Sequence, residues 1–414
     1  DISNRLNVNN IAFDGLRNDI NILNNESNLV VGVGVDELTN LNTIIYSHDL
    51  GNTWAAVTSS SSIFTDIGTG GQAIEYNGSL WVAGGKGTNT IAYSKDGINW
   101  TGAGAIFTNS GRVVKYDNYR GKWIMGGQGG NTLVYSYDGI NWIGLGNSSN
   151  DAKVMGFDLN NTRYVAAGEG TSSLVYSDDL ITWTAISPNP FQRGRCVLWT
   201  GRRWLVGGSK GSGSSTLLYS DDGENWIDTS NANDLTQGST NLFSTVVNAI
   251  ASNGSTIIAV GKGINNIVYS NDHGKTFAST SAAIGQGNSV EWCGTHWIVG
   301  GSQNLIYKSK DGIIWTKISE SPSPITPWHI TWNKSIYGTL GLIAEKVSLL
   351  EDKIDVSYRN VDISLHLLVD GDASFNNRVD ISNHLQVLGD ASFNNKVDIS
   401  ENLYVNGDVS FQRN

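Results

Sequence analysis

One phrase recurs seven times in this chain of 414 residues, and the repetition limits the possible folds more than any other feature of the sequence. Each copy contains a tyrosine, a serine, an aspartate and, after a turn, an aromatic residue, as in IAYSKDGINW at residues 91–100. The phrase tyrosines stand 38 to 50 residues apart, at positions 46, 93, 135, 176, 219, 269 and 307. Self-similarity at such an interval indicates one structural unit in each repeat.

Each repeat predicts four short antiparallel strands. In the second repeat, an apolar run at residues 73–76 precedes a second run at 80–85, and the phrase itself follows. Runs of β-branched and aromatic residues bounded by Gly, Asn and Asp are typical of strands, and the Asp-Gly turn predicts a hairpin between the third strand and the fourth. Four strands in each of seven repeats predict an all-β protein, with a seven-bladed β-propeller over residues 20–337.

Three segments could supply the strand that completes the first blade. Residues 11–13 and 20–23 precede the first phrase, and residues 328–332 follow the last one. We expect the late segment to complete the blade, because a strand from one end of the chain would then close a ring that the other end begins.

The repeated phrase resembles the Asp-box repeat of bacterial neuraminidases. The first and sixth copies match S-x-D-x-G-x-x-W, whereas the other five are one residue shorter between the aspartate and the aromatic residue. The resemblance implies a structural role, and the chemistry agrees, because an Asp in a turn can accept backbone N–H bonds while the aromatic ring packs beneath the turn. The predicted structural pairs are Asp49 and Trp54, Asp96 and Trp100, Asp138 and Trp142, Asp179 and Trp183, Asp222 and Trp226, Asp272 and Phe277, and Asp311 and Trp315.

The resemblance also requires a search for catalytic residues, since neuraminidase-like propellers carry an arginine triad, a Tyr–Glu pair and an Asp acid/base. Arg112, Arg195 and Arg203 lie at or beside predicted inner strands, and Glu75-Tyr76 and Glu291 occupy comparable places. The F-R-I-P element that accompanies the first catalytic arginine of the family is absent. We therefore predict that the three arginines bind a ligand and that the chain is not an enzyme, with a glycan-cleaving enzyme as the alternative.

No metal or cofactor is predicted. A single Asp in each box offers one or two oxygens, whereas calcium takes six to eight. Cys196 and Cys293 lack metal-ligand spacing. His366 and His384 occupy matching positions in a C-terminal repeat and could meet at a three-fold axis, but Asn402 stands at the third position, which favours surface histidines.

The overall charge argues against two classes of partner. The chain has 27 basic and 38 acidic residues, a net charge of −11, which disfavours binding to nucleic acid phosphates. No stretch approaches the roughly 20 apolar residues of a membrane-spanning helix, so no membrane insertion is expected.

Beyond residue 338 the pattern changes from a propeller to a stalk. An apolar spacing of 3, 4, 3, 4 predicts a short coiled coil over residues 338–357, which we expect to trimerise the chain. Residues 358–414 repeat every 18 residues, with VDIS beginning at 361, 379 and 397. Each unit predicts two strands and has too little apolar surface to fold alone, so we expect three chains to intertwine as a homotrimer. The predicted trimerisation residues are Leu340, Ile343, Val347, Leu350 and Ile354.

The 18-residue repeats resemble the shaft repeats of fibre proteins from phages and from large DNA viruses of algae and protists. Residues 1–8 look like one more unit, which predicts a shaft-like segment over residues 1–19. The resemblance implies a virion fibre or extracellular appendage that binds a host cell-surface glycan or receptor beside other virion or appendage proteins. A purely structural fibre without a ligand is a further alternative.

Overall fold

The computed structural model describes two compact units, Asp1–Leu340 and Gly341–Asn414. It describes residues 29–333, except 37–41, 59, 67, 148–152, 212–214, 233, 239–241, 281, 283 and 319–324, and nine short strands between residues 362 and 411. The predicted segment 1–19 and the predicted coiled coil with Leu340, Ile343, Val347, Leu350 and Ile354 lie outside the described residues, as do His366, His384 and Asn402.

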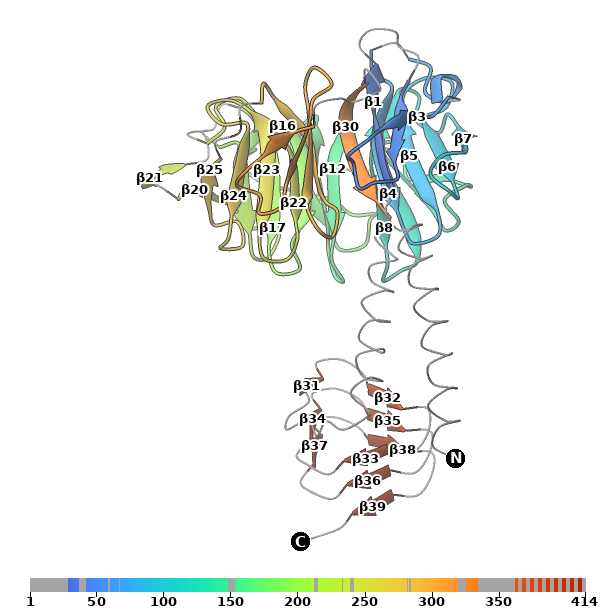
Figure 1. Cartoon of the computed structure of the whole chain (residues 1–414), viewed down its shortest axis with the longest axis vertical. Helices are drawn as coiled ribbons and strands as arrows, with labels where there is room; N and C mark the ends of the chain where they lie inside the picture. Colours follow the sequence, from blue (N-terminus) through green and yellow to red (C-terminus); the bar gives the residue numbers. More distant parts are fainter. Residues whose placement is uncertain are drawn as a thin grey trace, which may run out of the picture. The chain divides into compact units, whose positions relative to one another are not determined.

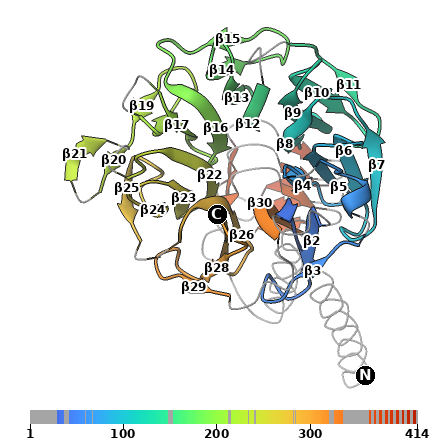
Figure 2. The same cartoon turned by 90° about the horizontal axis from the view of Figure 1, so that it is seen from above.

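The first unit is a β-propeller. Its described strands form seven four-stranded antiparallel blades arranged around a centre (Figure 2). A single pair, Gln128↔Lys153, joins blades 3 and 4 into one larger sheet, and Ser209↔Val246 joins blades 5 and 6 in the same way. Blade 1 contains β1 (Val30–Asp36), β2 (Ile44–Ser47), β3 (Ala55–Ala56) and β30 (Ile325–Trp332), and blade 2 contains β4 (Gly71–Tyr76), β5 (Trp81–Gly85), β6 (Ile91–Ser94) and β7 (Trp100–Gly104). Blade 3 contains β8 (Ser110–Asp117), β9 (Lys122–Gln128), β10 (Leu133–Ser136) and β11 (Ile143–Gly144), and blade 4 contains β12 (Lys153–Leu159), β13 (Tyr164–Glu169), β14 (Leu174–Ser177) and β15 (Thr184–Ala185). Blade 5 contains β16 (Phe191–Trp199), β17 (Trp204–Lys210), β18 (Leu217–Ser220) and β19 (Ile227–Asp228); blade 6 contains β22 (Val246–Ser252), β23 (Ile257–Lys262), β24 (Ile267–Ser270) and β25 (Thr276–Ser279); and blade 7 contains β26 (Gly287–Trp292), β27 (Trp297–Gly301), β28 (Ile306–Ser309) and β29 (Thr316–Lys317).

Two small elements lie outside the blades. A short hairpin of β20 (Ser230–Asn231) and β21 (Asp234–Gly238) joins blade 6, because β20 pairs in parallel with β25. A single 3₁₀ turn, η1 (Ser60–Ser62), is the only helical element among the residues that the structure describes.

The ring is closed by the late strand. β30 pairs antiparallel with β1 from Val30↔Trp332 to Asp36↔Ile325, so the last strand of the propeller becomes the inner strand of the blade that the N-terminal part begins. The prediction that residues 328–332 complete the first blade is confirmed. The two rival segments, 11–13 and 20–23, lie outside the described residues.

The hydrophobic core lies between neighbouring blades. One cluster joins Val31 of blade 1 to Ile74 of blade 2, and another joins Ile45 of blade 1 to Ile298 of blade 7. The second strands of four blades carry a tryptophan as their first or second residue, and each of these tryptophans is at most 1% exposed. Each packs against an aromatic residue at or next to the end of the inner strand of its own blade. These buried tryptophans are Trp81, Trp123, Trp204 and Trp297.

The second unit differs from its prediction. Each 18-residue repeat contributes three strands rather than two, and strands 18 residues apart pair in parallel within the same chain, as in Asp362↔Asp380↔Asp398 (Figure 1, red strands). The strands of one repeat therefore find their hydrogen-bonded neighbours in the next repeat of the same chain, whereas we expected neighbouring chains to supply the contacts that a single repeat lacks. The three sheets are β31 (Asp362–Ile363), β34 (Val379–Ile381) and β37 (Val397–Ile399); β32 (Leu367–Val369), β35 (Leu385–Val387) and β38 (Leu403–Val405); and β33 (Ala373–Phe375), β36 (Ala391–Phe393) and β39 (Val409–Phe411).

Candidate functional site

Every inner strand of the propeller carries a β-bulge, and β16 carries two. In blade 3, for example, Gly111 pairs with Gly127 and Val113 pairs with Gly126, so Arg112 is left without a partner in the ladder. A bulge bends its strand and re-aims the side chain of the extra residue, and such bulges are common beside binding sites. We name one passed-over residue from each of the seven blades the bulge ring: Trp328, Gln72, Arg112, Met155, Arg195, Asn248 and Asn288. Gln192, which is also passed over in β16, is not a member.

All seven residues of the bulge ring line one cavity of about 520 Å³. Its volume falls within the roughly 300–1,000 Å³ of ordinary ligand pockets. An adjoining cavity of about 200 Å³ continues from the bulge ring to Lys115, Glu291 and His329 on the inner strands. The view in Figure 2 looks along the centre that these inner strands surround.

Three nitrogens of the bulge ring are buried without a hydrogen-bond partner in the described part of the chain. They are Nε of Arg112, Nε of Arg195 and Nε2 of Gln72, whose residue is only 8% exposed. Burial and the charge of Arg195 lower the pKa of Arg112, and burial and the charge of Arg193 lower the pKa of Arg195. Both guanidinium groups nevertheless remain charged, since arginine does not lose its proton in proteins. Buried donors without acceptors are costly, and the arrangement favours a ligand that accepts hydrogen bonds.

One carboxylate lies near the arginine pair, and other cations already bind it. Glu169 interacts electrostatically with Arg112 and Arg195. It forms ion pairs with Lys153 and with Arg193, where Oε1 lies 3.2 Å from Nε. Four cations therefore share this carboxylate, and the surroundings of the arginine pair are locally positive although the chain as a whole is negative.

The remaining polar members of the bulge ring are held by contacts near the cavity. Nδ2 of Asn248 donates to the carbonyl of Gly287 at 2.8 Å, and Oδ1 of Asn288 accepts from Nε2 of Gln286 at 2.9 Å. Beside them, Trp328 is 38% exposed and presents an aromatic surface. The bulge ring thus combines two cations, three amides and an aromatic ring.

The structure separates Arg203 from the other two predicted arginines. Arg203 follows the turn between β16 and β17, and it does not line the cavity. Its Nε donates to Oδ1 of Asp221 at 2.6 Å, and its guanidinium lies 4.9 Å from the ring centre of Tyr219. Glu75 and Tyr76 line a different pocket of about 440 Å³ together with Asp158. A converging arginine triad with a Tyr–Glu pair is therefore not formed at the bulge ring.

The seven predicted boxes share one hydrogen-bond pattern. In each of them the serine Oγ donates to Oδ1 of the box aspartate. In the fourth box, the amides of Ile181 and Thr182 both donate to Oδ1 of Asp179 at 2.7 Å. Six box tryptophans donate from Nε1 to a carbonyl three residues earlier, whereas Phe277 has no such donor but is fully buried. The box aspartates thus organise turns in this structure.

The box aspartates should make the stability of the head depend on pH in acid. Hydrogen bonds from the amides of Thr182 and Ile181, and then from Ser177, lower the pKa of Asp179 to about 2. Because the folded pKa lies below the unfolded value of about 3.9, the stabilisation is fully present above pH 4 and is lost as the pH falls towards 2. We expect the melting temperature of the full chain to fall over this range in calorimetry. The fall should be smaller in Asp179→Asn, and an equal fall would contradict the assignment.

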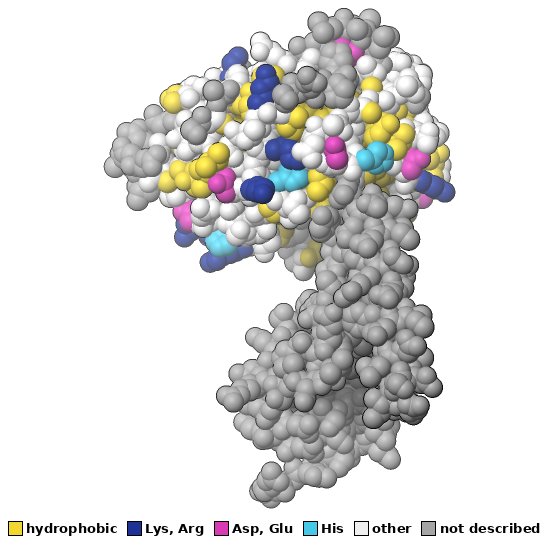
Figure 3. Space-filling view, viewed as in Figure 1, with side chains coloured by type: hydrophobic (Ala, Val, Ile, Leu, Met, Phe, Trp, Pro, Cys, Tyr) yellow, Lys and Arg dark blue, Asp and Glu magenta, His cyan; other side chains and the backbone are white. Residues whose placement is uncertain are grey.

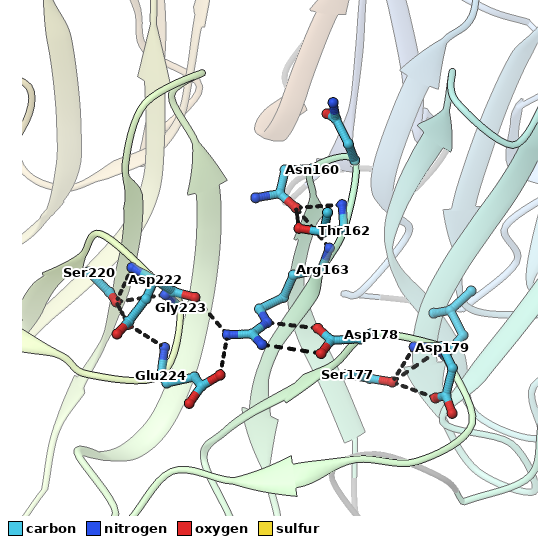
Figure 4. A network of polar contacts seen from close by, with 12 residues as sticks. Asn160, Thr162, Arg163, Ser177, Asp178, Asp179, Ser220, Asp222, Gly223 and Glu224 are labelled. Carbon is cyan, nitrogen blue, oxygen red and sulfur yellow. Dashed lines mark hydrogen bonds and ion pairs between the residues drawn. The ribbon is translucent and has the colours of Figure 1, made fainter.

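Sequence reasoning missed a set of contacts that join three of the boxes to the preceding blade. Arg163 of blade 4 donates from Nη1 to the carbonyl of Asp222 in the box of blade 5 at 2.7 Å, and the same nitrogen lies 2.7 Å from Oε1 of Glu224 (Figure 4). Arg203 reaches the carbonyl of His273 in the same way, and Nε2–H of His296 donates to the carbonyl of Leu50 at 2.8 Å. In these three cases the donor residue comes directly before the aromatic residue that begins the second strand of its blade. This shared position in the repeat is the sequence signal from which the contacts could have been predicted.

The described residues contain no helix long and apolar enough to cross a membrane. They also contain no group of three or more His, Cys, Asp or Glu side chains placed to hold a metal ion.

Comparisons with known proteins give no family. No family model matches the chain, and no curated protein matches it. Among solved structures, the chain is similar to the WD40 β-propeller domain of Doa1 (13% identity, 70% of this chain and 93% of that chain, TM-score 0.49). It is also similar to YCF48 bound to D1 peptide (16% identity, 67% and 87%, TM-score 0.47) and to the computationally designed Ika8 protein (10% identity, 67% and 79%, TM-score 0.45). The strand pairing of this chain itself defines the propeller.

Proposed function

We propose that the chain is a virion fibre or similar extracellular appendage whose propeller head attaches to a host surface by binding a glycan at the bulge ring. The observation that carries the proposal is the convergence of seven side chains, one from the bulge of each blade, on one cavity with unpartnered buried donors. Amides hydrogen-bond sugar hydroxyls, and an aromatic ring stacks on the apolar face of a sugar. Three long connections also support ligand binding at the bulge ring, because binding residues often lie on or beside long loops of a rigid scaffold. These connections, residues 58–71, 144–153 and 228–244, end shortly before Gln72, Met155 and Asn248.

The scaffold in this proposal is an Asp-box propeller. Its support is the shared turn geometry, in which a serine, the aspartate and an aromatic residue hold every box. The two boxes that match the family spacing use a threonine for an additional bond, as Thr53 Oγ1 donates to Oδ2 of Asp49 at 2.8 Å. Three of the shorter boxes use an asparagine instead, as Asn99 Nδ2 donates to Oδ2 of Asp96 at 2.7 Å.

Binding is favoured over glycan cleavage by the distribution of acidic groups. The seven members of the bulge ring include no carboxylate, and the Glu75-Tyr76 pair lines another pocket. Among the described residues that line the adjoining cavity, Glu291 is the one carboxylate. Hydrolysis of a glycosidic bond ordinarily requires two carboxyl groups flanking it. Turnover of fluorogenic glycosides by the full chain would contradict this part of the proposal.

The expected test is host-surface binding by a variant of the bulge ring. We expect Trp328→Ala in the full chain to reduce binding to host cells, or to a glycan array, by about 10-fold or more, because a stacked aromatic contact is lost. Tyr137→Ala is the matched control, since Tyr137 is 69% exposed on a box turn and does not line the cavity. Equal binding by both variants would place the ligand elsewhere.

The stalk completes the proposal as a homotrimer that joins the head to other virion or appendage proteins. The spacing of Leu340, Ile343, Val347, Leu350 and Ile354 supports a three-stranded seam, and the parallel pairing of the 18-residue repeats supports a fibrous shaft. Light scattering of the full chain should report three copies, and Ile343→Asp should report one. A monomeric wild-type chain at micromolar concentration would exclude the trimer.

A further inference from the structure

Three of the turns that join an inner strand to the second strand of its blade carry the same short sequence. Each begins with an asparagine directly after the inner strand and has serine or threonine two residues later, with no proline between them. Asn-x-Ser/Thr is the acceptor sequence for N-linked glycosylation, which modifies surface loops of secreted proteins. The three turns are Asn77-Gly78-Ser79 after β4, Asn160-Asn161-Thr162 after β12 and Asn253-Gly254-Ser255 after β22. Further copies that begin at residues 25, 147 and 333 extend outside the described residues.

The three turns share one hydrogen-bond pattern, which uses the amide oxygen of the asparagine. In blade 4, Oδ1 of Asn160 accepts from the backbone N–H of Thr162 at 3.0 Å, from Oγ1–H of Thr162 at 3.2 Å and from the N–H of Arg163 at 2.8 Å. The same three bonds form at Asn77 and Asn253. No other described residue accepts a hydrogen bond from Nδ2 of these asparagines, and Figure 4 shows Nδ2 of Asn160 directed away from its turn.

Formation of such a turn does not require an asparagine. In blade 5 the turn begins with Thr200, whose Oγ1 accepts from the N–H of Arg203 at 3.0 Å. In blade 3 it begins with Asp117, whose Oδ1 accepts from the N–H of Arg120 at 3.1 Å. Neither of these two turns has serine or threonine two positions later, whereas all three asparagine turns do. The pairing of asparagine with a hydroxyl residue therefore goes beyond what the turn needs.

The asparagine turns lie at the end of the blades opposite the bulge ring. In these three blades the bulge-ring residue is among the first three residues of the inner strand, whereas the asparagine follows the last one. The serine or threonine of each turn is exposed, and the asparagine is half-buried. A glycan attached there extends into solvent and leaves the bulge ring clear.

We infer that Asn77, Asn160 and Asn253 are acceptors of N-linked glycans; this inference rests on the extracellular location in the proposed function. In the transfer, Nδ2 attacks the anomeric carbon of an oligosaccharide carried on a lipid diphosphate. The bond from that carbon to the diphosphate oxygen breaks, the lipid diphosphate leaves with the electron pair, and a base of the transferring enzyme takes one proton from Nδ2. Because each turn is held by bonds within four residues, its geometry is available to the enzyme before the blades assemble.

Glycans at these turns would hydrate a surface that has few charges. Only 16% of the residues are charged, and the side of the head drawn in Figure 3 shows hydrophobic side chains among the polar ones. The box turns lie at the same end of the blades, and they expose Ile181 and Ile314. Arg163, next to the turn of Asn160, reaches the box of blade 5, so a glycan at Asn160 lies beside a box. Attached glycans are bulky and solubilising, which suits them to shield such apolar side chains.

The test produces the full chain behind an added secretion signal in a eukaryotic cell that carries out N-linked transfer. Glycans of the secreted chain are removed enzymatically in heavy-oxygen water, which converts each modified asparagine to a labelled aspartate that mass spectrometry locates. We expect the label at all three asparagines, and Thr162→Ser, which keeps the hydroxyl, should retain it at Asn160. Removal of one hydroxyl should abolish the label in that turn alone, in Ser79→Ala, Thr162→Ala and Ser255→Ala.

Asn99 provides a matched control at the same end of the blades. It also begins an Asn-x-Thr sequence and is exposed, but its Nδ2 donates to Oδ2 of Asp96 at 2.7 Å. Because transfer to Asn99 requires the loss of a hydrogen bond to a charged group, we expect about 10-fold less label there. Equal label at Asn99 and at the three turns, or no label at the turns of a secreted chain, would overturn the inference.

Host-cell binding separates this inference from the proposed function. Absence of the label together with intact binding to host cells or to a glycan array would overturn the acceptor sites alone. A labelled chain that bound neither host cells nor any glycan would overturn the proposed attachment and leave the acceptor sites assigned.

Discussion

Substitution of Ile330 by aspartate should open the ring of blades and unfold the head. Ile330 lies in the middle of β30, is completely buried, and packs with Val30, Ile45 and Ile298 at the seam between blade 7 and blade 1. A carboxylate there would lose its water without gaining a partner, and we expect a loss of about 4 kcal/mol or more in the free energy of unfolding. Denaturant titration of the full chain, followed by tryptophan fluorescence, measures this loss.

Hydrogen exchange distinguishes opening of the ring from general damage. β1 pairs with β30 on one side and with β2 on the other, so the amides of β1 that face β30 should lose protection first, whereas β12 in blade 4 should keep it near the midpoint. Ile330→Val is the control, for which the usual cost is about 0.5–1.5 kcal/mol. Uniform loss of protection in all blades of Ile330→Asp would show that the seam is not the first part to open.

The blades could be predicted from the sequence because their strands are fixed by a repeated local pattern. Every phrase tyrosine falls on a third strand, as Tyr93 does on β6 and Tyr219 on β18. The aspartate and glycine that follow make a turn with bonds inside the same ten residues, so no distant contact is needed to specify it. Closure by β30 could be predicted only from the ring architecture, because a closed ring requires that a late strand complete the blade that the N-terminal part begins.

The bulge ring could not be predicted, because a bulge is a property of the pairing between two strands. Its members share a position but no residue type: glutamine, arginine, methionine, asparagine and tryptophan all occur there. Their charge singles out Arg112 and Arg195 in the sequence, whereas the sequence predicts Trp328 only as part of the closing strand. Arg203 has the same charge but follows a turn, where Asp221 binds it.

The number of strands in each stalk repeat also could not be predicted from the sequence. A period of 18 residues fits two strands with long turns as well as three strands of three residues, such as β34, β35 and β36. Three-residue strands carry too little alternation to be recognised by pattern. Only the pairing of each strand with its copy one repeat later decides between the two descriptions.

Removal of a box ring should be the second large effect, and Trp100 is the sharpest position for it. Trp100 is 8% exposed, packs with Trp81 and Val31 in the core between blades 1 and 2, and donates from Nε1 to the carbonyl of Gly97 at 2.9 Å. Trp100→Ala should lower the free energy of unfolding of the head by about 3–5 kcal/mol, since large buried rings replaced by alanine leave a cavity. Calorimetry of the full chain should show the loss as a lower melting temperature of the head.

Two further variants separate packing from hydrogen bonding at this box. Trp100→Phe keeps most of the ring but removes the bond to Gly97, and it should cost only about 1 kcal/mol from that bond, together with a smaller loss of packing. Trp328→Ala removes a ring that is 38% exposed at the bulge ring, and it should leave the melting temperature nearly unchanged while reducing ligand binding. The contrary outcome is an unchanged melting temperature for Trp100→Ala together with a lowered melting temperature for Trp328→Ala. It would mean that the box rings are available to ligands and that the exposed ring of Trp328 is structural, and it would contradict both assigned roles.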